Sequence, residues 1–231
     1  MQRSIGPVVV FDASNFPLAY GVCGGDTASA LATGNPVIAR CHPAHPATGR
    51  LCAEAVRRAL DKCGLPQGLF SLIQGVSHDV GAMLVKHPLA QAIGFTGSQR
   101  GGRAIFDMAT QRDRPIPCFA EMGSINPLAI LPGALTERSD EIVTGLAASI
   151  TLGAGQFCTK PGVVFLIAGD RTERFVSALA QQIEQAPGYT MLYEQIRANY
   201  ERGTSAVAKT PAVRTHVAAK CAPPTNANAA L

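Results

Sequence analysis

Short apolar runs alternate with amphipathic segments through the first half of the chain, and this alternation restricts the fold more than any other feature. The runs typical of buried strands are 7–11, 36–39, 69–73 and 92–95. The segments between them with helical spacing are 26–33, 46–63, 79–86 and 98–111. Pro46 suits a first helical turn and Gly64 suits a C-terminal cap, which supports the longest of these helices. Alternation of this kind predicts a parallel sheet with helices on its faces.

After Pro115 the alternation becomes less regular. Strand candidates are 116–121, 128–131 and 163–167, and helix candidates are 141–151 and 172–185. The whole pattern predicts an α/β protein, in which a parallel Rossmann-like sheet with flanking helices is followed by part of an α/β catalytic domain. We expect a dinucleotide-binding domain over 1–121, a partial catalytic domain over 122–220 and a disordered tail over 221–231, since the tail has no periodicity.

The composition excludes several classes of protein. With 231 residues, 47% of them hydrophobic, the chain can bury a substantial core. The net charge is only +4 and the basic residues are scattered, so we expect no nucleic-acid partner. The seven cysteines have irregular spacing without a CxxC pair, which indicates a reduced, cytoplasmic protein. No apolar stretch is long enough to span a bilayer, so we expect no membrane partner.

Three polar residues stand where predicted strands give way to loops. Cys158 lies in a Gly-Gln-Phe-Cys-Thr-Lys-Pro-Gly segment directly before an apolar run. Glu121 is a lone carboxylate between an apolar segment and a glycine turn, and Asn15 precedes Phe-Pro after the first strand. A nucleophile, a base and an amide donor in such positions favour covalent catalysis on a carbonyl. Taken singly, each also has an ordinary structural explanation: a buried thiol, a solvated carboxylate and a turn residue.

A glycine-rich turn follows the fourth predicted strand, whereas no Gly-x-Gly-x-x-Gly motif follows the first. Gly97 lets the backbone turn tightly into the next helix, where Ser98 and the free amides can donate to a pyrophosphate. Gly102 removes a side chain where the helix approaches the sheet or a ligand. By itself, this Gly-Ser-x-x-x-Gly pattern is more often a plain strand-to-helix turn.

In the order Asn, Gly-Ser loop, Glu and Cys, these motifs resemble the aldehyde dehydrogenase superfamily. The segments Glu-Met-Gly-Ser-Ile-Asn-Pro and Gly-Gln-Phe-Cys-Thr are most similar to the branch that oxidises 2-oxoglutarate semialdehyde (2,5-dioxovalerate). The resemblance implies that the Cys158 thiolate adds to a small oxo- or acidic aldehyde, and that the Asn15 amide and the Cys158 N–H hold the oxyanion. It also implies hydride transfer to a nicotinamide, followed by hydrolysis of the thioester by water that Glu121 activates.

The same resemblance implies a nicotinamide cofactor and the residues that bind it. They are Ala13, Ser14, Arg40, Gly68, Phe95, Gly97, Ser98 and Gly102. Relatives usually have Lys where Arg40 stands, and many NAD-preferring ones place Glu where this chain has Pro43. An arginine fork without a repelling carboxylate favours a 2′-phosphate, so we expect NADP, with NAD as the alternative.

Several other candidate residues receive no chemical role. His42 and His45 have the spacing of a metal-binding pair, but no third ligand stands at suitable local spacing, so we expect no metal. The six other cysteines lack the surroundings of Cys158 and are interpreted as structural. Asn126 is interpreted as shaping the turn after Glu121.

The resemblance extends from Met1 to about Tyr200 and leaves two functions open. Relatives carry a region before this point and a downstream Glu-x-Phe-Gly-Pro motif, so we expect a central fragment of a larger enzyme whose full-length relatives are homo-oligomers. The first function is oxidation of an aldehyde. The sequence does not identify this aldehyde, because most segments that line the substrate tunnel in relatives lie outside this chain. The second is that of a catalytically incompetent remnant that at most binds nucleotide or a partner subunit. Transfer of the acyl group to coenzyme A is disfavoured because Glu121 is present as a hydrolytic base.

Overall fold

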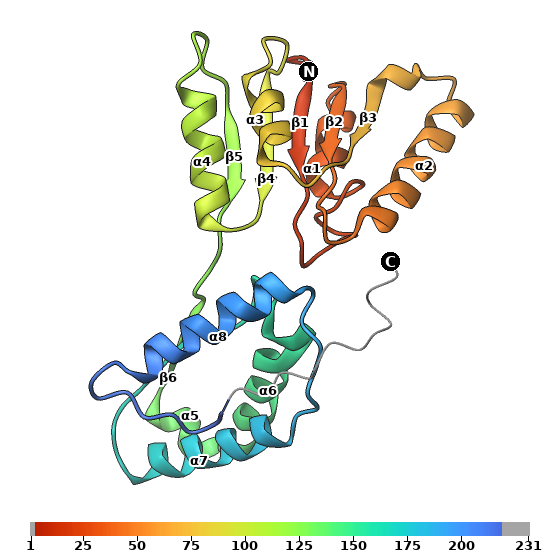
Figure 1. Ribbon diagram of the computed structural model, residues 1–231. Coiled ribbons are helices and arrows are strands. Elements are labelled where there is room, and N and C mark those ends of the chain that lie inside the picture. Colours follow the sequence, from red (N-terminus) through yellow and green to blue (C-terminus); the bar gives the residue numbers. More distant parts are fainter. Residues whose placement is uncertain (1–2, 219–231) are drawn as a thin grey trace. The chain divides into compact units, whose positions relative to one another are not determined.

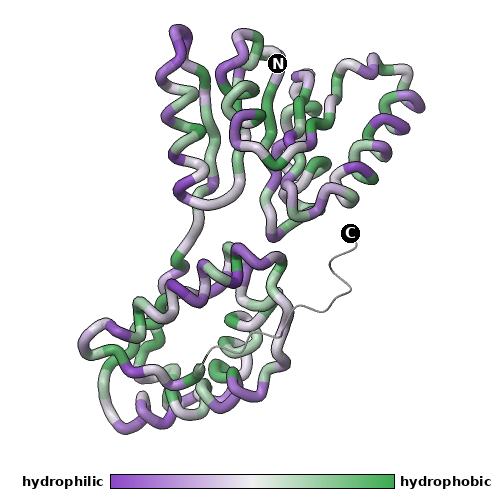
Figure 2. The backbone as a smooth tube through the Cα atoms, viewed as in Figure 1, coloured by the Kyte–Doolittle hydropathy of each residue, from purple (hydrophilic) through white to green (hydrophobic). Residues whose placement is uncertain are grey.

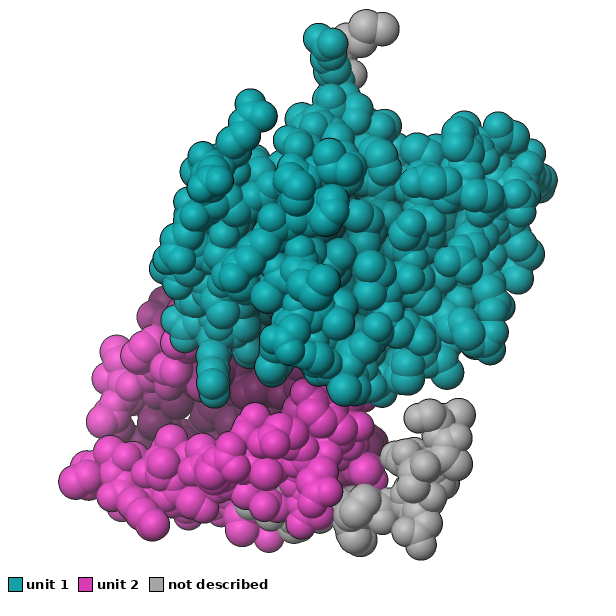
Figure 3. Space-filling view, turned by 45° about the horizontal axis from the view of Figure 1, so that its top comes forward, with its two compact units in different colours: residues 1–123, 231 teal, residues 124–230 magenta. Residues whose placement is uncertain are grey.

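The computed structural model describes residues 3–218, which form two compact units. The first unit extends to Gly123 and the second begins at Ser124 (Figure 3). The predicted disordered tail, 221–231, lies outside the described residues. The assignment of a dinucleotide-binding domain to 1–121 and of a partial catalytic domain to 122–220 stays a prediction about function.

Five parallel strands in the first unit form one sheet in the order β3-β2-β1-β4-β5 (Figure 1). They are β1 (Val8–Phe11), β2 (Val37–Arg40), β3 (Phe70–Ile73), β4 (Ala92–Thr96) and β5 (Cys118–Glu121). The central strand β1 is buried along its whole length and pairs with β2 on one side and with β4 on the other. A parallel sheet covered on both faces has continuous apolar strands, which is why the sequence pattern predicts them. The predicted parallel Rossmann-like sheet with flanking helices is confirmed.

Successive residues of β1 point to opposite faces of the sheet and join two separate cores. The helices of this unit are α1 (Gly25–Ala32), α2 (Pro46–Lys62), η1 (Gln67–Leu69), α3 (His78–Lys86) and α4 (Gln99–Thr110). Val8 and Val10 pack in one core with buried residues of α1 and α2. Val9 and Phe11 pack in the other core with α3 and α4. Figure 2 colours β1 as hydrophobic, in agreement with its contribution to both cores.

The helix boundaries differ from the predicted ones by one or two residues, and the caps explain the differences. Helix α1 has its N-cap at Gly24, and Asp26 lies in its first turn. Ser98 is the N-cap of α4, and its Oγ accepts a hydrogen bond from the Gly101 N–H at 3.2 Å. Gly64 follows α2 with φ 64°, the left-handed conformation expected of a C-terminal glycine.

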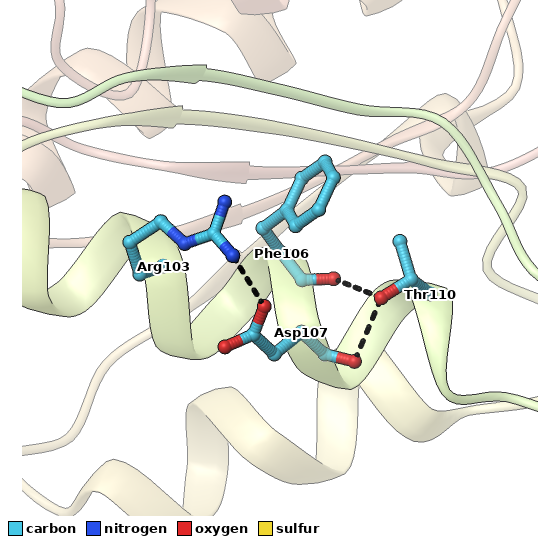
Figure 4. Close-up of polar contacts among 4 residues, drawn as sticks. All are labelled: Arg103, Phe106, Asp107 and Thr110. Atoms are coloured by element: carbon cyan, nitrogen blue, oxygen red, sulfur yellow. Dashed lines mark hydrogen bonds and ion pairs between the residues drawn. The ribbon is translucent and has the colours of Figure 1, made fainter.

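The outer face of α4 carries polar contacts that explain its amphipathic pattern (Figure 4). Arg103 forms an ion pair with Asp107 one turn later, at 3.0 Å, and its guanidinium lies 5.0 Å from the centre of the Phe106 ring. The Thr110 hydroxyl donates to the carbonyl oxygens of Phe106 and Asp107. Exposed pairs of this kind contribute a few tenths of a kcal/mol each, roughly 0.3–0.5, so α4 is stabilised mainly by its buried face.

The second unit combines two short parallel strands with helices. Its elements are β6 (Pro127–Ile130), α5 (Pro132–Glu137), α6 (Ser139–Thr151), η2 (Leu152–Gly155), β7 (Val163–Leu166), α7 (Asp170–Gln185) and α8 (Glu194–Ala208). The sequence pattern misses α5, which is short, and α8, which has no buried residue and therefore only a weak apolar stripe. Within residues 3–218, no helix has both the length and the apolar character needed to cross a membrane.

The β6–β7 sheet has a covered face and an exposed face. Ile130, Val164 and Leu166 pack into a core with α5, α6 and α7. On the other face, which we call the β6–β7 outer face, lie Pro127, Ala129, Val163 and Phe165. Phe165 is 59% exposed, so this face of the second unit carries a large apolar side chain that its own unit does not cover.

Candidate active site

Cys158 lies in the loop between η2 and β7 and is half-buried. Its carbonyl oxygen accepts hydrogen bonds from the Asn126 side-chain amide, at 2.6 Å, and from the Ser124 hydroxyl. The same Asn126 amide donates to the Lys160 carbonyl oxygen at 2.9 Å. Asn126 therefore holds the backbone of the candidate nucleophile at two points, which is more than the turn-shaping role inferred from the sequence.

The backbone before Cys158 is bent by three successive left-handed residues. They are Gly153 and Ala154, both at φ 58°, and Gly155 at φ 69°. A Cβ atom at Gly153 would lie 2.7 Å from the Phe157 ring, so the turn tolerates no side chain there. Ala154 adopts a conformation that costs a non-glycine residue about 1–2 kcal/mol. This bend redirects the chain from α6 into the thiol loop.

Glu121, the candidate base, is the last residue of β5 and is exposed. Its register partner on β4 is Thr96. The Gly97 N–H donates a hydrogen bond to the Glu121 carbonyl oxygen at 3.0 Å. The candidate base and the candidate pyrophosphate turn are thus neighbours at one edge of the sheet.

Asn15, the candidate oxyanion donor, lies in a compact turn after β1 and is half-buried. The turn is closed by a hydrogen bond from the Ala13 N–H to the Tyr20 carbonyl oxygen at 2.9 Å. The rings of Phe16 and Tyr20 pack edge to face, 5.6 Å apart. Aromatic packing and a main-chain bond therefore fix the segment that carries the Asn15 amide.

Most candidate cofactor residues stand at or just after the carboxyl ends of β1, β2 and β4, which meet at one edge because the strands are parallel. They are Ala13, Ser14, Arg40, Phe95, Gly97 and Ser98. A Cβ atom at Gly97 would lie 2.7 Å from the Phe95 ring, and one at Gly102 would lie 2.3 Å from Met122 Cγ. Neither glycine admits a Cβ atom unless its neighbour shifts, and the free amides at the start of α4 fit an anionic group such as the pyrophosphate of a dinucleotide.

Gly68 does not share this edge, and the cofactor-binding role expected for it stays a prediction. It lies in η1, before β3, and therefore at the opposite end of the sheet from the other candidate cofactor residues. The loop after β3 occupies the cofactor edge instead, where Arg40 Nη2 donates to the carbonyl oxygens of Gly75 and Ser77 at 3.1 and 3.5 Å. The apolar pattern of the sequence does not indicate a role for this loop. Its signal is Gly75, at φ 154°, just after the third apolar run.

Next to these residues lies the buried carboxyl group of Asp12, which the sequence pattern does not indicate as a functional residue. Asp12 is 5% exposed, and neither of its oxygens has a hydrogen-bond partner of normal geometry within residues 3–218. Burial raises the pKa of Asp12 to about 7, although the His42 backbone, the Arg40 charge and the Cys41 thiol act in the opposite direction. Burial, with the neighbouring His45 and Arg40, lowers the pKa of His42 to about 4.

The strand order, the helices on both faces and the glycine turn at the carboxyl edge define a Rossmann-like class of α/β fold. Residues 1–195 match the model of the aldehyde dehydrogenase family, and the chain belongs to this family. Members of this family are oxidoreductases that oxidise aldehydes with NAD(P).

Two curated relatives have similar names. The chain is 50% identical over 210 residues to alpha-ketoglutaric semialdehyde dehydrogenase 2 of Azospirillum brasilense, which covers 91% of this chain and 40% of the relative. It is 45% identical over 203 residues to alpha-ketoglutaric semialdehyde dehydrogenase of Acinetobacter baylyi, which covers 88% of this chain and 38% of the relative. The chain thus spans about two fifths of the length of these relatives.

Solved structures support the fold. A mutant of proline utilization A from Bradyrhizobium japonicum matches 96% of this chain and 23% of its own, with a TM-score of 0.81 and 22% identity. Glyceraldehyde-3-phosphate dehydrogenase GapN from Methanocaldococcus jannaschii, complexed with NADP, matches 90% of this chain and 45% of its own, with a TM-score of 0.78 and 22% identity. At this identity the likeness establishes the arrangement of the chain and nothing finer.

Proposed function

We propose that this chain carries the chemistry that oxidises an aldehyde to a carboxylic acid with NADP, with Cys158 as the nucleophile. The observation that supports this most directly is the setting of Cys158. A half-buried thiol lies in a loop whose backbone is held by the Asn126 amide and bent by three left-handed residues. A catalytic nucleophile needs such preorganisation, whereas a structural cysteine does not.

Each proposed side chain has one task. The Cys158 thiolate adds to the aldehyde carbon, and the oxyanion of the thiohemiacetal is stabilised by the Asn15 amide and the Cys158 N–H. A nicotinamide cofactor, when bound, would supply the hydride acceptor, and loss of hydride from the thiohemiacetal carbon would leave a thioester on Cys158. Glu121 then takes a proton from water, whose oxygen attacks the thioester carbon. The carboxylic acid leaves and the thiolate returns.

The proposed cofactor contacts come from the carboxyl edge of the sheet. The amides at the start of α4 and the Ser98 hydroxyl would hold the pyrophosphate, and Arg40 would contact the adenosine ribose and its 2′-phosphate. Ala13, Ser14, Phe95, Gly97 and Gly102 would shape the surface against which the dinucleotide lies. Gly68 is not part of this proposal.

The proposed substrate is a small oxo- or acidic aldehyde such as 2-oxoglutarate semialdehyde. Two relatives at 50% and 45% identity bear the name of that activity, and this similarity supports the proposal. A second candidate function is that of a non-catalytic chain that binds nucleotide or a partner subunit. The exposed β6–β7 outer face favours it, because this face would pack against further protein.

Thiol mapping distinguishes the two candidates. The full chain is treated with a limiting amount of an alkylating reagent, with and without 2-oxoglutarate semialdehyde and NADP, and each cysteine is quantified by mass spectrometry. We expect the two compounds to slow alkylation of Cys158 at least several-fold and to leave the exposed Cys63 unchanged. Equal alkylation of Cys158 in all conditions, with NADP still bound, would establish the second candidate instead.

A further inference from the structure

Three side chains of different chemistry converge at the carboxyl ends of β1 and β2. Asp12 follows β1, Cys41 follows β2 and His45 directly precedes α2, and one ligand atom of each lies within 4.8 Å of those of the other two. The pairing of the two strands causes this convergence: Phe11 is the register partner of Arg40, so the next residues leave the sheet side by side. The cluster lies beside the proposed active-site residues and includes none of them.

The burial of the Asp12 carboxyl group is only partly offset by its neighbours, the His42 backbone, the Arg40 charge and the Cys41 thiol. Asp12 is 95% buried by exposed area, and neither oxygen accepts a hydrogen bond of normal geometry within the described residues. Burial of an unpaired carboxylate is unfavourable, and proteins normally compensate it with hydrogen bonds, an opposite charge or a metal ion. The nearest cation, Arg40, directs its Nη2 to the carbonyl oxygens of Gly75 and Ser77 instead.

His45 is oriented as a metal-binding imidazole would be. Its Nε2 lies 2.9 Å from the Ala13 carbonyl oxygen, a contact that requires the proton on this nitrogen. The lone pair is then on Nδ1, which is buried and has no hydrogen-bond partner among residues 3–218. Histidines that bind metals usually donate their other N–H to a carbonyl or carboxylate oxygen in this manner, which fixes the ring and its tautomer.

We propose that Asp12, Cys41 and His45 form a binding site for a divalent cation of the zinc class. A carboxylate oxygen, a thiolate and an imidazole nitrogen are the three ligand types that zinc takes in proteins, and together they balance its charge. Because the three ligand atoms lie within 4.8 Å of one another, a cation equidistant from them and in their plane would lie at most about 2.8 Å from each. Zinc–ligand bonds of about 2.0–2.3 Å then need an inward movement of at most about 0.5–0.8 Å. A fourth position is left for water.

The sequence around His42 and His45 does not indicate this site. The expectation of no metal rested on the lack of a third ligand nearby in the sequence, but Asp12 and Cys41 are brought to His45 by strand pairing. Of the two histidines, His45 belongs to the cluster and His42 does not.

Cobalt titration of the full chain tests the proposal, because Co²⁺ occupies zinc sites and is coloured. We expect a thiolate-to-cobalt charge-transfer band in the near ultraviolet that saturates at one Co²⁺ per chain and is displaced by Zn²⁺. Cys41→Ser should abolish the band, and Asp12→Asn or His45→Gln should weaken Co²⁺ binding at least 10-fold, about the loss typical of zinc-site changes. Cys52→Ser and His42→Gln are the matched controls and should keep both the band and the affinity.

A second measurement covers the case in which Cys41→Ser does not fold, since Cys41 is part of the core. Zn²⁺ should raise the Tm of the wild-type chain and leave the Tm of Asp12→Asn unchanged, because that variant keeps the shape of the side chain and loses its charge. The proposal is overturned if the wild-type chain shows no saturable Co²⁺ band. It is also overturned if the band persists in folded Cys41→Ser, or if Zn²⁺ stabilises Asp12→Asn as much as the wild-type chain.

Discussion

At the scale of single residues, Asn126 connects backbone geometry with the candidate chemistry. It adopts φ 50°, a left-handed conformation that asparagine tolerates better than most residues. That conformation accompanies the placement of its amide against the carbonyl oxygens of Cys158 and Lys160. The sequence shows an Asn-Pro turn, but the loop with Cys158 and Lys160 lies far along the chain from Asn126. Only the structure therefore reveals the two hydrogen bonds.

Asn126→Ala should loosen the thiol loop. It removes two hydrogen bonds, each of about 1 kcal/mol, and places alanine in a conformation that costs about 1 kcal/mol more than for glycine. We expect a lower Tm and faster alkylation of Cys158, measured against Cys63 in the same sample. Asn126→Gly is the matched control. It should regain the part of the stability that alanine loses through its backbone conformation, and its Cys158 should still be alkylated faster than in the wild-type chain. An unchanged alkylation rate in both variants would show that Asn126 does not hold the loop.

Arg40 should set the preference between the two dinucleotides. Its cation stands at the cofactor edge, and Pro43 supplies no carboxylate that would repel a 2′-phosphate. We expect tighter binding of NADP than of NAD by calorimetric titration, and loss of this difference in Arg40→Ala. Arg103→Ala, which removes a surface arginine of α4, should leave both affinities unchanged. Equal affinities for the two cofactors that Arg40→Ala does not alter would contradict the assignment.

At the scale of elements, the close approach of α4 to the end of β5 depends on a glycine. A Cβ atom at Gly102 would lie 2.3 Å from Met122 Cγ and 3.1 Å from the Phe95 ring. The sequence is compatible with two reasons for this glycine, helix packing and the approach of a ligand. Packing against Met122 is sufficient to explain it.

Gly102→Ala should therefore destabilise the first unit although alanine favours helix formation. Overpacking costs about 1–3 kcal/mol, against a gain of about 1 kcal/mol from helix propensity. Met122→Ala should restore stability in the double variant, since it removes the clashing atoms. Gly145→Ala, in α6, meets nothing within 4 Å and should be neutral or stabilising. Additive effects of the two changes in denaturant unfolding would rule out the contact.

At the scale of the whole molecule, the sequence predicts the sheet better than the candidate site. Apolar runs and caps are local signals, so β1 to β5 and most helices follow from them. The end of the sheet at which a residue lies depends on connectivity, so the sequence pattern does not show that Gly68, before β3, lies at the opposite end from the other candidate cofactor residues. The cluster of Asp12, Cys41 and His45 depends on strand pairing and has no local signal.

The β6–β7 outer face should make the chain self-associate. Val163 and Phe165 expose apolar surface on a short parallel sheet whose other face is already packed. We expect light scattering to rise with protein concentration, and Phe165→Ser to reduce this rise. Leu89→Ser changes a side chain that is 65% exposed in the first unit, and it should have little effect. Identical scattering from the two variants would exclude the outer face as the cause.

The hydrogen bond between the Gly97 N–H and the Glu121 carbonyl oxygen has a consequence for control of the reaction. It joins two main-chain groups, so of the natural amino acids only proline at position 97 would delete it. If phosphate groups bind at the glycine turn as proposed, a shift of this turn would be transmitted to the peptide group of Glu121. Occupancy of the proposed nucleotide site and the orientation of the proposed base would then be coupled through the main chain, and substitutions other than proline would leave this link in place.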